Sequence, residues 1–242
     1  EVEIAIRNVI EYEFKNNINY INKNLDEITS NRQLRNFFPW ELYFIDVFDG
    51  KNGFDLVVGN PPYIFARSSK EKDLSKENKI YYKENYKLSV YQINTYILFV
   101  ELGDALLNNN GLLSYIIPNN WMTIKTDKEF REFVLNKNFI ELTNFYKKVF
   151  PTQDVDASIL IFSKESGDGV INLQEYTNNF EFISQKSTKY FKNDDSIINI
   201  ELVKNPQFQN AIREIEKNTI PLGDLFECKV GVKCYQVGKG RP

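Results

Sequence analysis

Apolar residues recur at spacings near the helical period along the first part of the chain. They are Ile4, Ile6, Val9, Ile10, Phe14, Ile18 and Ile21. No glycine or proline interrupts residues 1–36, and an uninterrupted pattern with this period favours a helix over a strand. We therefore predict a helical segment over residues 1–36 that packs through its apolar face.

The following residues alternate between short apolar runs and longer amphipathic stretches. An aromatic-rich stretch, 37–48, ends at the turn signal Asp49-Gly50, and the run 54–59 is typical of a strand buried on both faces. Further strands are predicted at 112–117, 139–149 and 157–163. Two helices are predicted between them: 91–107, closed by a left-handed cap over 108–111, and 126–136, opened by a capping box with Glu129.

This order of elements predicts an α/β fold. Strands that alternate with helices form crossover units in a mostly parallel sheet. The link between the strands 139–149 and 157–163 is too short for a parallel crossover. We therefore expect these last two strands to form an antiparallel hairpin.

Polar stretches divide the chain into segments. Residues 67–87 are rich in lysine and serine and carry three tyrosines, which indicates a mobile surface loop. Gly167-Asp168-Gly169 indicates a boundary, beyond which the pattern is weak except for a helix near 206–217. The predicted organisation is a helical segment at 1–36, a main α/β part at 37–165, a linker region with one helix at 166–219, and a further segment at 220–242.

Composition restricts the class of protein. The chain has 242 residues, of which 42% are hydrophobic, enough for one sizeable core. No apolar run is long enough to cross a bilayer and no signal segment is visible, so we expect no membrane contact and a cytoplasmic location. Because the first residue is Glu1 and the only methionine is Met122, the chain fits an excised fragment.

The absence of histidine excludes several kinds of chemistry. Ser-His-Asp catalysis, Cys-His catalysis and histidine metal sites all require a residue that the chain does not contain. Cys228 and Cys234 have no further cysteine with which to complete a zinc site, so we expect reduced thiols and no metal. The net charge of −3 argues against a uniformly basic surface but is compatible with a local basic groove for nucleic acid.

Asn60-Pro61-Pro62-Tyr63, here called the tetrapeptide, directly follows the predicted strand 54–59. In open α/β sheets, ligands bind outside the carboxyl ends of the strands. The exocyclic amine of a nucleobase is a poor nucleophile, because its lone pair is delocalised into the ring. Asn60 offers a side-chain carbonyl and Pro61 a backbone carbonyl fixed by two prolines, so the pair can hold both N–H groups of such an amine. Tyr63 adds an aromatic face for the base.

The segment from Trp40 to Tyr63 resembles the γ-class N6-adenine DNA methyltransferases, particularly those of type IIG restriction–modification enzymes. The likeness continues in the family's motif order through Asn94-Thr95-Tyr96, Gly111, Trp121-Met122 and Val149-Phe150-Pro151, which leads into Ala157-Ser158-Ile159-Leu160-Ile161-Phe162. The resemblance implies the C-terminal half of a Rossmann-like methyltransferase domain that uses S-adenosylmethionine. It also implies that residues 220–242 are the start of a target-recognition domain.

The same resemblance assigns roles to individual residues. Asn60 and Pro61 would hold the amine, while Tyr63 and Phe150 would stack on an adenine flipped out of double-stranded DNA, since the target atom is unreachable inside the duplex. The lysines and the arginine of the tail, Lys229, Lys233, Lys239 and Arg241, give it a basic character. That tail is either a phosphate-contacting edge or a solvated terminus.

The chain departs from the family at the cofactor. The family binds S-adenosylmethionine through a glycine-rich strand–turn–helix, and residues 1–36 contain no glycine. Asn60 and Asp46 remain as candidate cofactor contacts, with loop capping as the alternative role of Asp46. We therefore expect that the rest of the polypeptide supplies the N-terminal half of the domain, with a nuclease domain as a further candidate part, and that the fragment alone is inactive.

Other functions fit the same tetrapeptide. It also serves methyl transfer to guanine N2 in ribosomal RNA and to a glutamine side chain in protein. A non-catalytic DNA-specificity module with the same fold is an alternative of a different class. The aromatic-rich segment before the tetrapeptide, the predicted hairpin and the recognition-like tail favour DNA adenine over these.

Overall fold

The computed structural model describes residues 38, 40–64, 75–90, 93–150, 155–192 and 195–227. The chain divides into two compact units, Glu1–Lys51 and Asn52–Pro242, which are described separately. The helix predicted for 1–36 and the tail 228–242 lie outside the described residues. These two units differ from the sequence-based segments, whose boundaries were placed at 36, 165 and 219.

In the first unit, two short helices carry the aromatic-rich stretch. They are α2 (Trp40–Tyr43) and α3 (Ile45–Lys51). The rings of Phe38 and Tyr43 stack with their centroids 4.9 Å apart. The turn predicted at Asp49-Gly50 lies inside α3, and the chain turns later, where Asn52 and Gly53 have positive φ.

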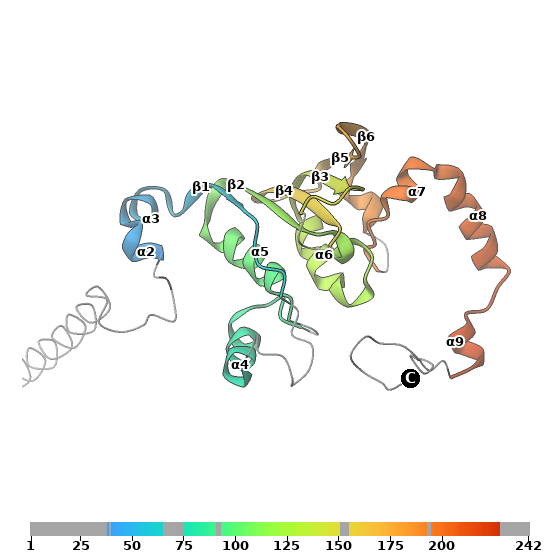
Figure 1. The fold of residues 1–242 in the computed structure, drawn as a ribbon, viewed down its shortest axis with the longest axis horizontal. Helices are drawn as coiled ribbons and strands as arrows, with labels where there is room; N and C mark the ends of the chain where they lie inside the picture. The colour runs from blue at the N-terminus through green and yellow to red at the C-terminus, as the bar shows by residue number, and fades with distance from the viewer. Residues whose placement is uncertain are drawn as a thin grey trace, which may run out of the picture. The chain divides into compact units, whose positions relative to one another are not determined.

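The second unit is built on a mixed six-stranded sheet (Figure 1). Its strands are β1 (Phe54–Gly59), β2 (Leu107–Pro118), β3 (Lys137–Phe145), β4 (Ala157–Ser166), β5 (Val170–Tyr176) and β6 (Phe180–Ser187), in the spatial order β1-β2-β4-β3-β5-β6. The helical elements of this unit are α4 (Lys76–Asn85), α5 (Thr95–Leu106), η1 (Asn119–Met122), η2 (Lys125–Asp127), α6 (Lys128–Leu135), η3 (Thr188–Phe191), α7 (Ile200–Lys204), α8 (Pro206–Lys217) and α9 (Leu222–Leu225). The predicted α/β fold class is therefore confirmed.

The pairing of the strands brings their carboxyl ends together. β1 is parallel to β2, and β3 is parallel to β5. β4 lies antiparallel between β2 and β3, as the short link predicted. The carboxyl ends of β1, β2, β3 and β5 consequently lie along one edge of the sheet, here called the site edge.

The core lies between the sheet and two helices. In Figure 1, α5 and α6 are both drawn below the strands, and their buried side chains join those of the strands in one cluster. Trp121, Phe130 and Phe162 are among the largest fully buried side chains. The indole of Trp121 donates to the Ser158 hydroxyl over 3.2 Å, so the largest buried ring keeps its polar atom satisfied.

Strand β1 corrects one prediction. Its apolar run was expected to be buried on both faces, but Leu56 and Val58 are 55% and 69% exposed. In the described sheet β1 has a partner on one side only, β2. An edge strand leaves part of its surface uncovered, and an apolar run alone does not distinguish it from a central strand.

The cap predicted over residues 108–111 is also wrong, because β2 begins at Leu107, where α5 ends. Leu107 is fully buried and pairs with Phe54. Gly111 is needed for close approach, since a Cβ there would lie 2.6 Å from the carbonyl oxygen of Phe54. The glycine that indicated a helix end therefore allows two strands to come close together.

Three further differences concern helix starts and loops. Helix α6 begins at Lys128, and its N-cap Asp127 makes no side-chain cap bond, so the predicted capping box with Glu129 is absent. Within the predicted loop 67–87, residues 76–85 form helix α4. The predicted linker 166–219 contains β5 and β6, which extend the main sheet, as well as the predicted helix, now α8.

Candidate functional site

The tetrapeptide leaves the sheet at the carboxyl end of β1. Pro61 is buried, whereas Asn60 and Pro62 are exposed. Burial of Pro61 anchors the backbone here, and the rings of Pro61 and Pro62 each restrict φ. The Asn60 side chain therefore stands at the site edge on an anchored support.

Tyr63 is held from two directions. Its hydroxyl donates to the carbonyl oxygen of Ile116 in β2 over 3.1 Å. Its ring meets that of Tyr96 edge-on, with centroids 6.5 Å apart and an interplanar angle of 89°. Burial raises the pKa of Tyr63 to about 12, so the hydroxyl stays protonated and keeps this bond near neutral pH.

Phe150 comes from a different part of the chain and lies next to Tyr63. The two ring centroids are 6.2 Å apart, with an interplanar angle of 68°. Both side chains are half-buried. The structure thus brings together the two aromatic residues that the sequence placed in one site, and they form two differently oriented apolar surfaces beside the tetrapeptide.

Sequence reasoning did not single out Thr95 as a site residue. Its hydroxyl donates to the carbonyl oxygen of Pro62 over 2.5 Å and accepts the backbone N–H of Ile64 over 3.0 Å. The backbone N–H of Thr95 donates to the Ile64 carbonyl over 3.1 Å. The predicted helix 91–107 placed Thr95 inside its first turns, whereas α5 begins at Thr95, so the sequence carried only a weak signal for this role.

Asparagines link the neighbouring strand ends. The Asn119 side chain, just beyond β2, donates to that of Asn144 in β3 over 2.9 Å. Asn120 accepts a longer bond, 3.4 Å, from the Tyr96 hydroxyl. These contacts tie the ends of β2 and β3 to the helix that supports Tyr63, so the site edge is braced by side-chain as well as backbone bonds.

Asp46, the other predicted cofactor contact, lies in the first turn of α3 with its side chain exposed. It belongs to the first unit, and its role stays a prediction. Asn60, the first predicted cofactor contact, is exposed in the second unit, and its role towards a cofactor also stays a prediction. The arrangement is suited to hold the acceptor of a reaction: two carbonyl acceptors beside two aromatic rings.

The described residues bear on two other kinds of function. They contain no group of three or more Cys, Asp or Glu side chains placed to hold a metal ion. Within the same ranges, no helix has the length and apolar character needed to span a membrane.

Comparison with known proteins gives a family match over residues 1–150, to the family described as Eco57I restriction-modification methylase. This stretch covers more than half of the chain and includes the tetrapeptide and Phe150. It confirms the resemblance to restriction–modification methyltransferases that the sequence motifs indicated.

Two curated relatives agree with the family match. The chain is 30% identical over 62% of its length to the Escherichia coli type II restriction enzyme and methyltransferase RM.Eco57I, and covers 14% of that protein. It is 28% identical over 77% of its length to the Thermus thermophilus type II methyltransferase M.TthHB8I, and covers 42% of it. A crystal structure of the type IIG restriction endonuclease BpuSI aligns with 69% of the chain and 22% of its own, at 16% identity and a TM-score of 0.47.

The chain thus spans less than half of either curated relative. The family match covers strand β1, the tetrapeptide after it and the helix that begins at Thr95. These are the elements that form the described site. The chain belongs to the Eco57I restriction-modification methylase family.

Proposed function

We propose that this chain provides the acceptor side of a DNA methyltransferase that transfers a methyl group from S-adenosylmethionine to adenine N6. The single observation that carries the proposal is the tetrapeptide at the carboxyl end of β1 with the rings of Tyr63 and Phe150 6.2 Å apart beside it. The polar acceptors can hold the amine of a planar base, and the two ring faces can stack on the base itself.

In this proposal Asn60 and Pro61 hold the amine. The Asn60 side-chain carbonyl and the Pro61 backbone carbonyl each accept one N–H, which favours a more tetrahedral nitrogen and directs its lone pair. S-adenosylmethionine supplies an electrophilic methyl group when bound. Methyl transfer then depends mainly on alignment, which can contribute about 7–11 kcal/mol. Neither role requires histidine, which the chain does not contain.

Tyr63 and Phe150 receive the base. Inside a duplex, adenine N6 is not accessible for in-line attack on the methyl group of a donor, so the base must leave the stack. Stacking on an aromatic ring contributes about 1–3 kcal/mol per base, which offsets part of the cost of extrusion. Tyr63 is suited to this because its hydroxyl bond to Ile116 fixes the ring orientation.

The setting is proposed from the relatives. RM.Eco57I is named both a restriction enzyme and a methyltransferase, so we propose that the chain works within a type IIG restriction–modification system on double-stranded DNA. The remaining polypeptide would supply the glycine-rich cofactor loop, and Asn60 and Asp46 would add contacts to the cofactor. By this proposal, residues 1–242 alone neither bind the cofactor tightly nor transfer methyl groups.

The acceptor class can be tested directly. The full-length parent protein is incubated with radiolabelled S-adenosylmethionine and, in parallel, duplex DNA, ribosomal RNA or a protein extract. We expect label in DNA, its loss with Asn60→Ala and its retention with Asn109→Ala, a change of the same kind at an exposed position in β2. Label in RNA or protein would show that the chain belongs to another class of amino-methyltransferase. Specific DNA binding without label would show that it is a recognition module.

A further inference from the structure

Ile64 and Thr95 meet beside the tetrapeptide, although they are 31 residues apart in the chain. They are joined by hydrogen bonds 3.0 Å and 3.1 Å long. Helix α4 lies between them in the sequence, and none of its residues is buried. A surface helix therefore belongs to the sequence that separates the tetrapeptide from Thr95.

Both ends of α4 are fixed. The Ser75 side chain accepts the backbone N–H of Asn78 over 3.1 Å at the start of the helix. Beyond its end, the Glu101 carboxylate in α5 accepts the backbone N–H groups of Lys87 and Leu88 over 2.8 Å and 2.9 Å. Glu101 is six residues beyond Thr95 in α5. This anchor therefore lies about 9 Å along the helix axis from Thr95, which binds the tetrapeptide.

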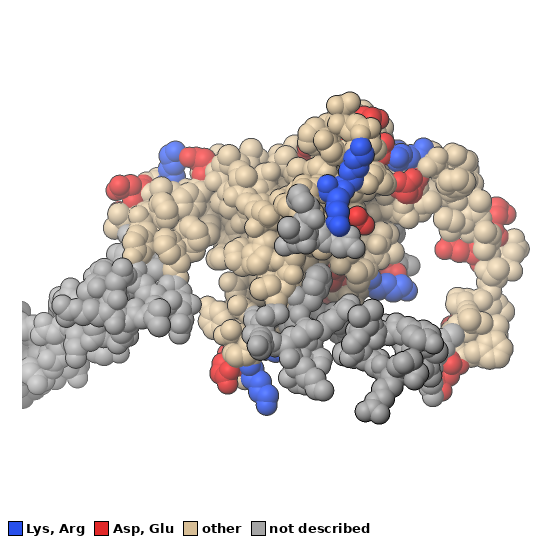
Figure 2. Space-filling model, in the orientation of Figure 1, with Lys and Arg blue, Asp and Glu red and all other residues tan. Residues whose placement is uncertain are grey.

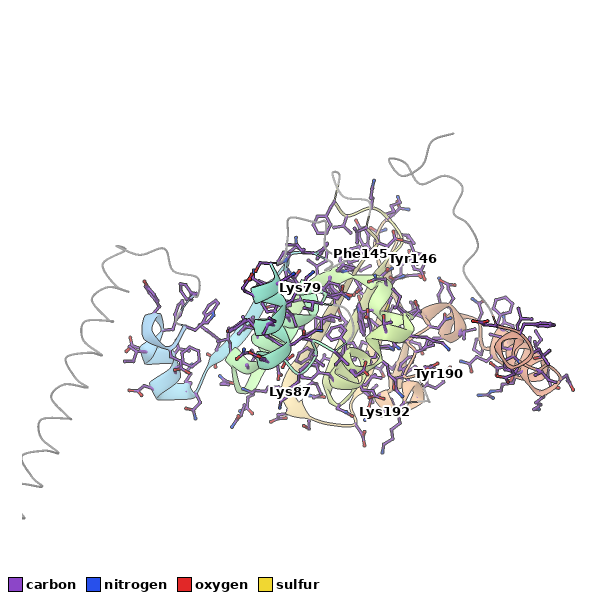
Figure 3. The ribbon with its side chains drawn as sticks, turned by 90° about the horizontal axis from the view of Figure 1, so that it is seen from below. Lys79, Lys87, Phe145, Tyr146, Tyr190 and Lys192 are labelled. Atoms are coloured by element: carbon purple, nitrogen blue, oxygen red, sulfur yellow. The ribbon has the colours of Figure 1, made fainter. Side chains whose placement is uncertain are left out.

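Lysines line one face of α4. Lys76, Lys79 and Lys83 are spaced i, i+3 and i+7, so they share one face of the helix. We call these three residues together with Lys87, which follows the helix, the lysine stripe. Figure 3 labels Lys79 and Lys87, and Figure 2 shows basic side chains projecting from α4 next to acidic ones.

Within the described residues, none of the ammonium groups of the lysine stripe makes an ion pair. Residues 75–90 contain four lysines and two glutamates, a net charge of +2, in a chain whose net charge is −3. Like charges at i, i+4, such as Lys79 and Lys83, destabilise an isolated helix. A bound polyanion would remove this repulsion.

We propose that the lysine stripe contacts the phosphates of the substrate DNA next to the extruded base. The axial span from Lys76 to Lys83 is about 10 Å, close to the rise of about three base pairs. Because phosphate contacts position a protein on the duplex without reading sequence, the stripe sets the register of the tetrapeptide on its target strand. This inference rests on the proposed DNA methyltransferase function.

The test uses the full-length parent protein and a duplex that it methylates. Lys79→Gln/Lys83→Gln is compared with Lys189→Gln/Lys192→Gln, which removes the same charge near the opposite edge of the sheet, where each lysine pairs with Asp168 over 3.0 Å. The KM for DNA and its dependence on salt are measured together with the KM for S-adenosylmethionine.

We expect the α4 double variant to raise the KM for DNA about 10-fold at moderate salt and to reduce the salt slope by about two. Its KM for the cofactor and its kcat at saturating DNA should stay near wild type, and Lys79→Arg/Lys83→Arg should restore the KM for DNA. If wild type methylates DNA but the two glutamine variants behave alike, the inference fails and the proposed function stands. If wild type does not methylate DNA, both fail.

Discussion

Thr95 shows how a single side chain can position the proposed acceptor residues without touching substrate. Its hydroxyl holds the Pro62 carbonyl and the Ile64 N–H at once. Thr95→Val keeps the shape but leaves both partners without a bond, which costs about 1–3 kcal/mol for a buried group.

We predict that Thr95→Val lowers kcat of the full-length protein about 10-fold, because the tetrapeptide loosens, while the KM for DNA changes much less. Thr95→Ser, which keeps the hydroxyl, should retain most of the activity. Steady-state kinetics on both variants measures this, and an unchanged kcat for the valine variant would remove Thr95 from the site.

The raised pKa of Tyr63 predicts a loss of stability at alkaline pH. Its pKa is raised by burial from 10.0 to about 12, so between these values the folded protein keeps a proton that the unfolded chain releases. Stability should therefore fall as pH rises from 10 through 12. Denaturant unfolding should show that the free energy of unfolding falls more steeply with pH in wild type than in Tyr63→Phe. Parallel curves for the two proteins would mean that Tyr63 is not buried as described.

At the scale of elements, the junction of β1 and β2 depends on two glycines. At Gly53, with φ of +137°, a Cβ would lie 2.5 Å from the Leu106 carbonyl oxygen, and at Gly111 it would lie 2.6 Å from that of Phe54. Neither neighbour is a flexible side chain that can move aside. The backbone itself must shift to accept a side chain.

We predict that Gly53→Ala and Gly111→Ala each lower the free energy of unfolding by about 1–3 kcal/mol. Gly50→Ala is the matched control, because a Cβ there meets nothing within 4 Å and alanine favours the helix. Chemical denaturation compares the three variants. Equal stability for all three would show that β1 and β2 do not approach as described.

Sequence patterns predicted elements where local periodicity and burial agree. Helix α8 was predicted with its bounds, since Pro206 can begin a helix and the apolar spacing continues to its end. Strand β5 was missed, although Ile171 and Leu173 are fully buried and alternate with polar residues. Its apolar pattern is short, and its parallel partner β3 is distant in sequence, so only the folded sheet reveals it.

At the scale of the whole chain, Arg131 joins distant segments. Its guanidinium is fully buried and donates to the carbonyl oxygens of Trp121, Ile124 and Asp195, over 2.7 Å, 2.5 Å and 2.9 Å. Burial lowers the pKa of this group. The contacts link α6 and the turns after β2 to the segment that follows β6.

We predict that Arg131→Met lowers the free energy of unfolding by about 3 kcal/mol or more, because three carbonyl groups lose a charged donor. Arg213→Met, at an exposed position of α8, should change it by less than about 0.5 kcal/mol. Thermal and denaturant unfolding would measure both. A small effect at Arg131 would mean that these segments are held by other contacts.

The candidate site was predicted in part. The tetrapeptide follows its strand at the site edge, and Tyr63 and Phe150 lie together, as the motifs indicated. Thr95 and the Asn119–Asn144 bond were not predicted, because they depend on which strand ends become neighbours. A sequence motif identifies the residues of a reaction more readily than those that hold them in place.

The most direct measurement is the identity of the methylated nucleoside. Duplex DNA is treated with the full-length protein and S-adenosylmethionine, digested to nucleosides and analysed by mass spectrometry, for wild type, Asn60→Ala and Asn109→Ala. We predict N6-methyladenine with wild type and Asn109→Ala, and its loss with Asn60→Ala. Methylated cytosine or guanine in its place, or N6-methyladenine formed undiminished by Asn60→Ala, would contradict it.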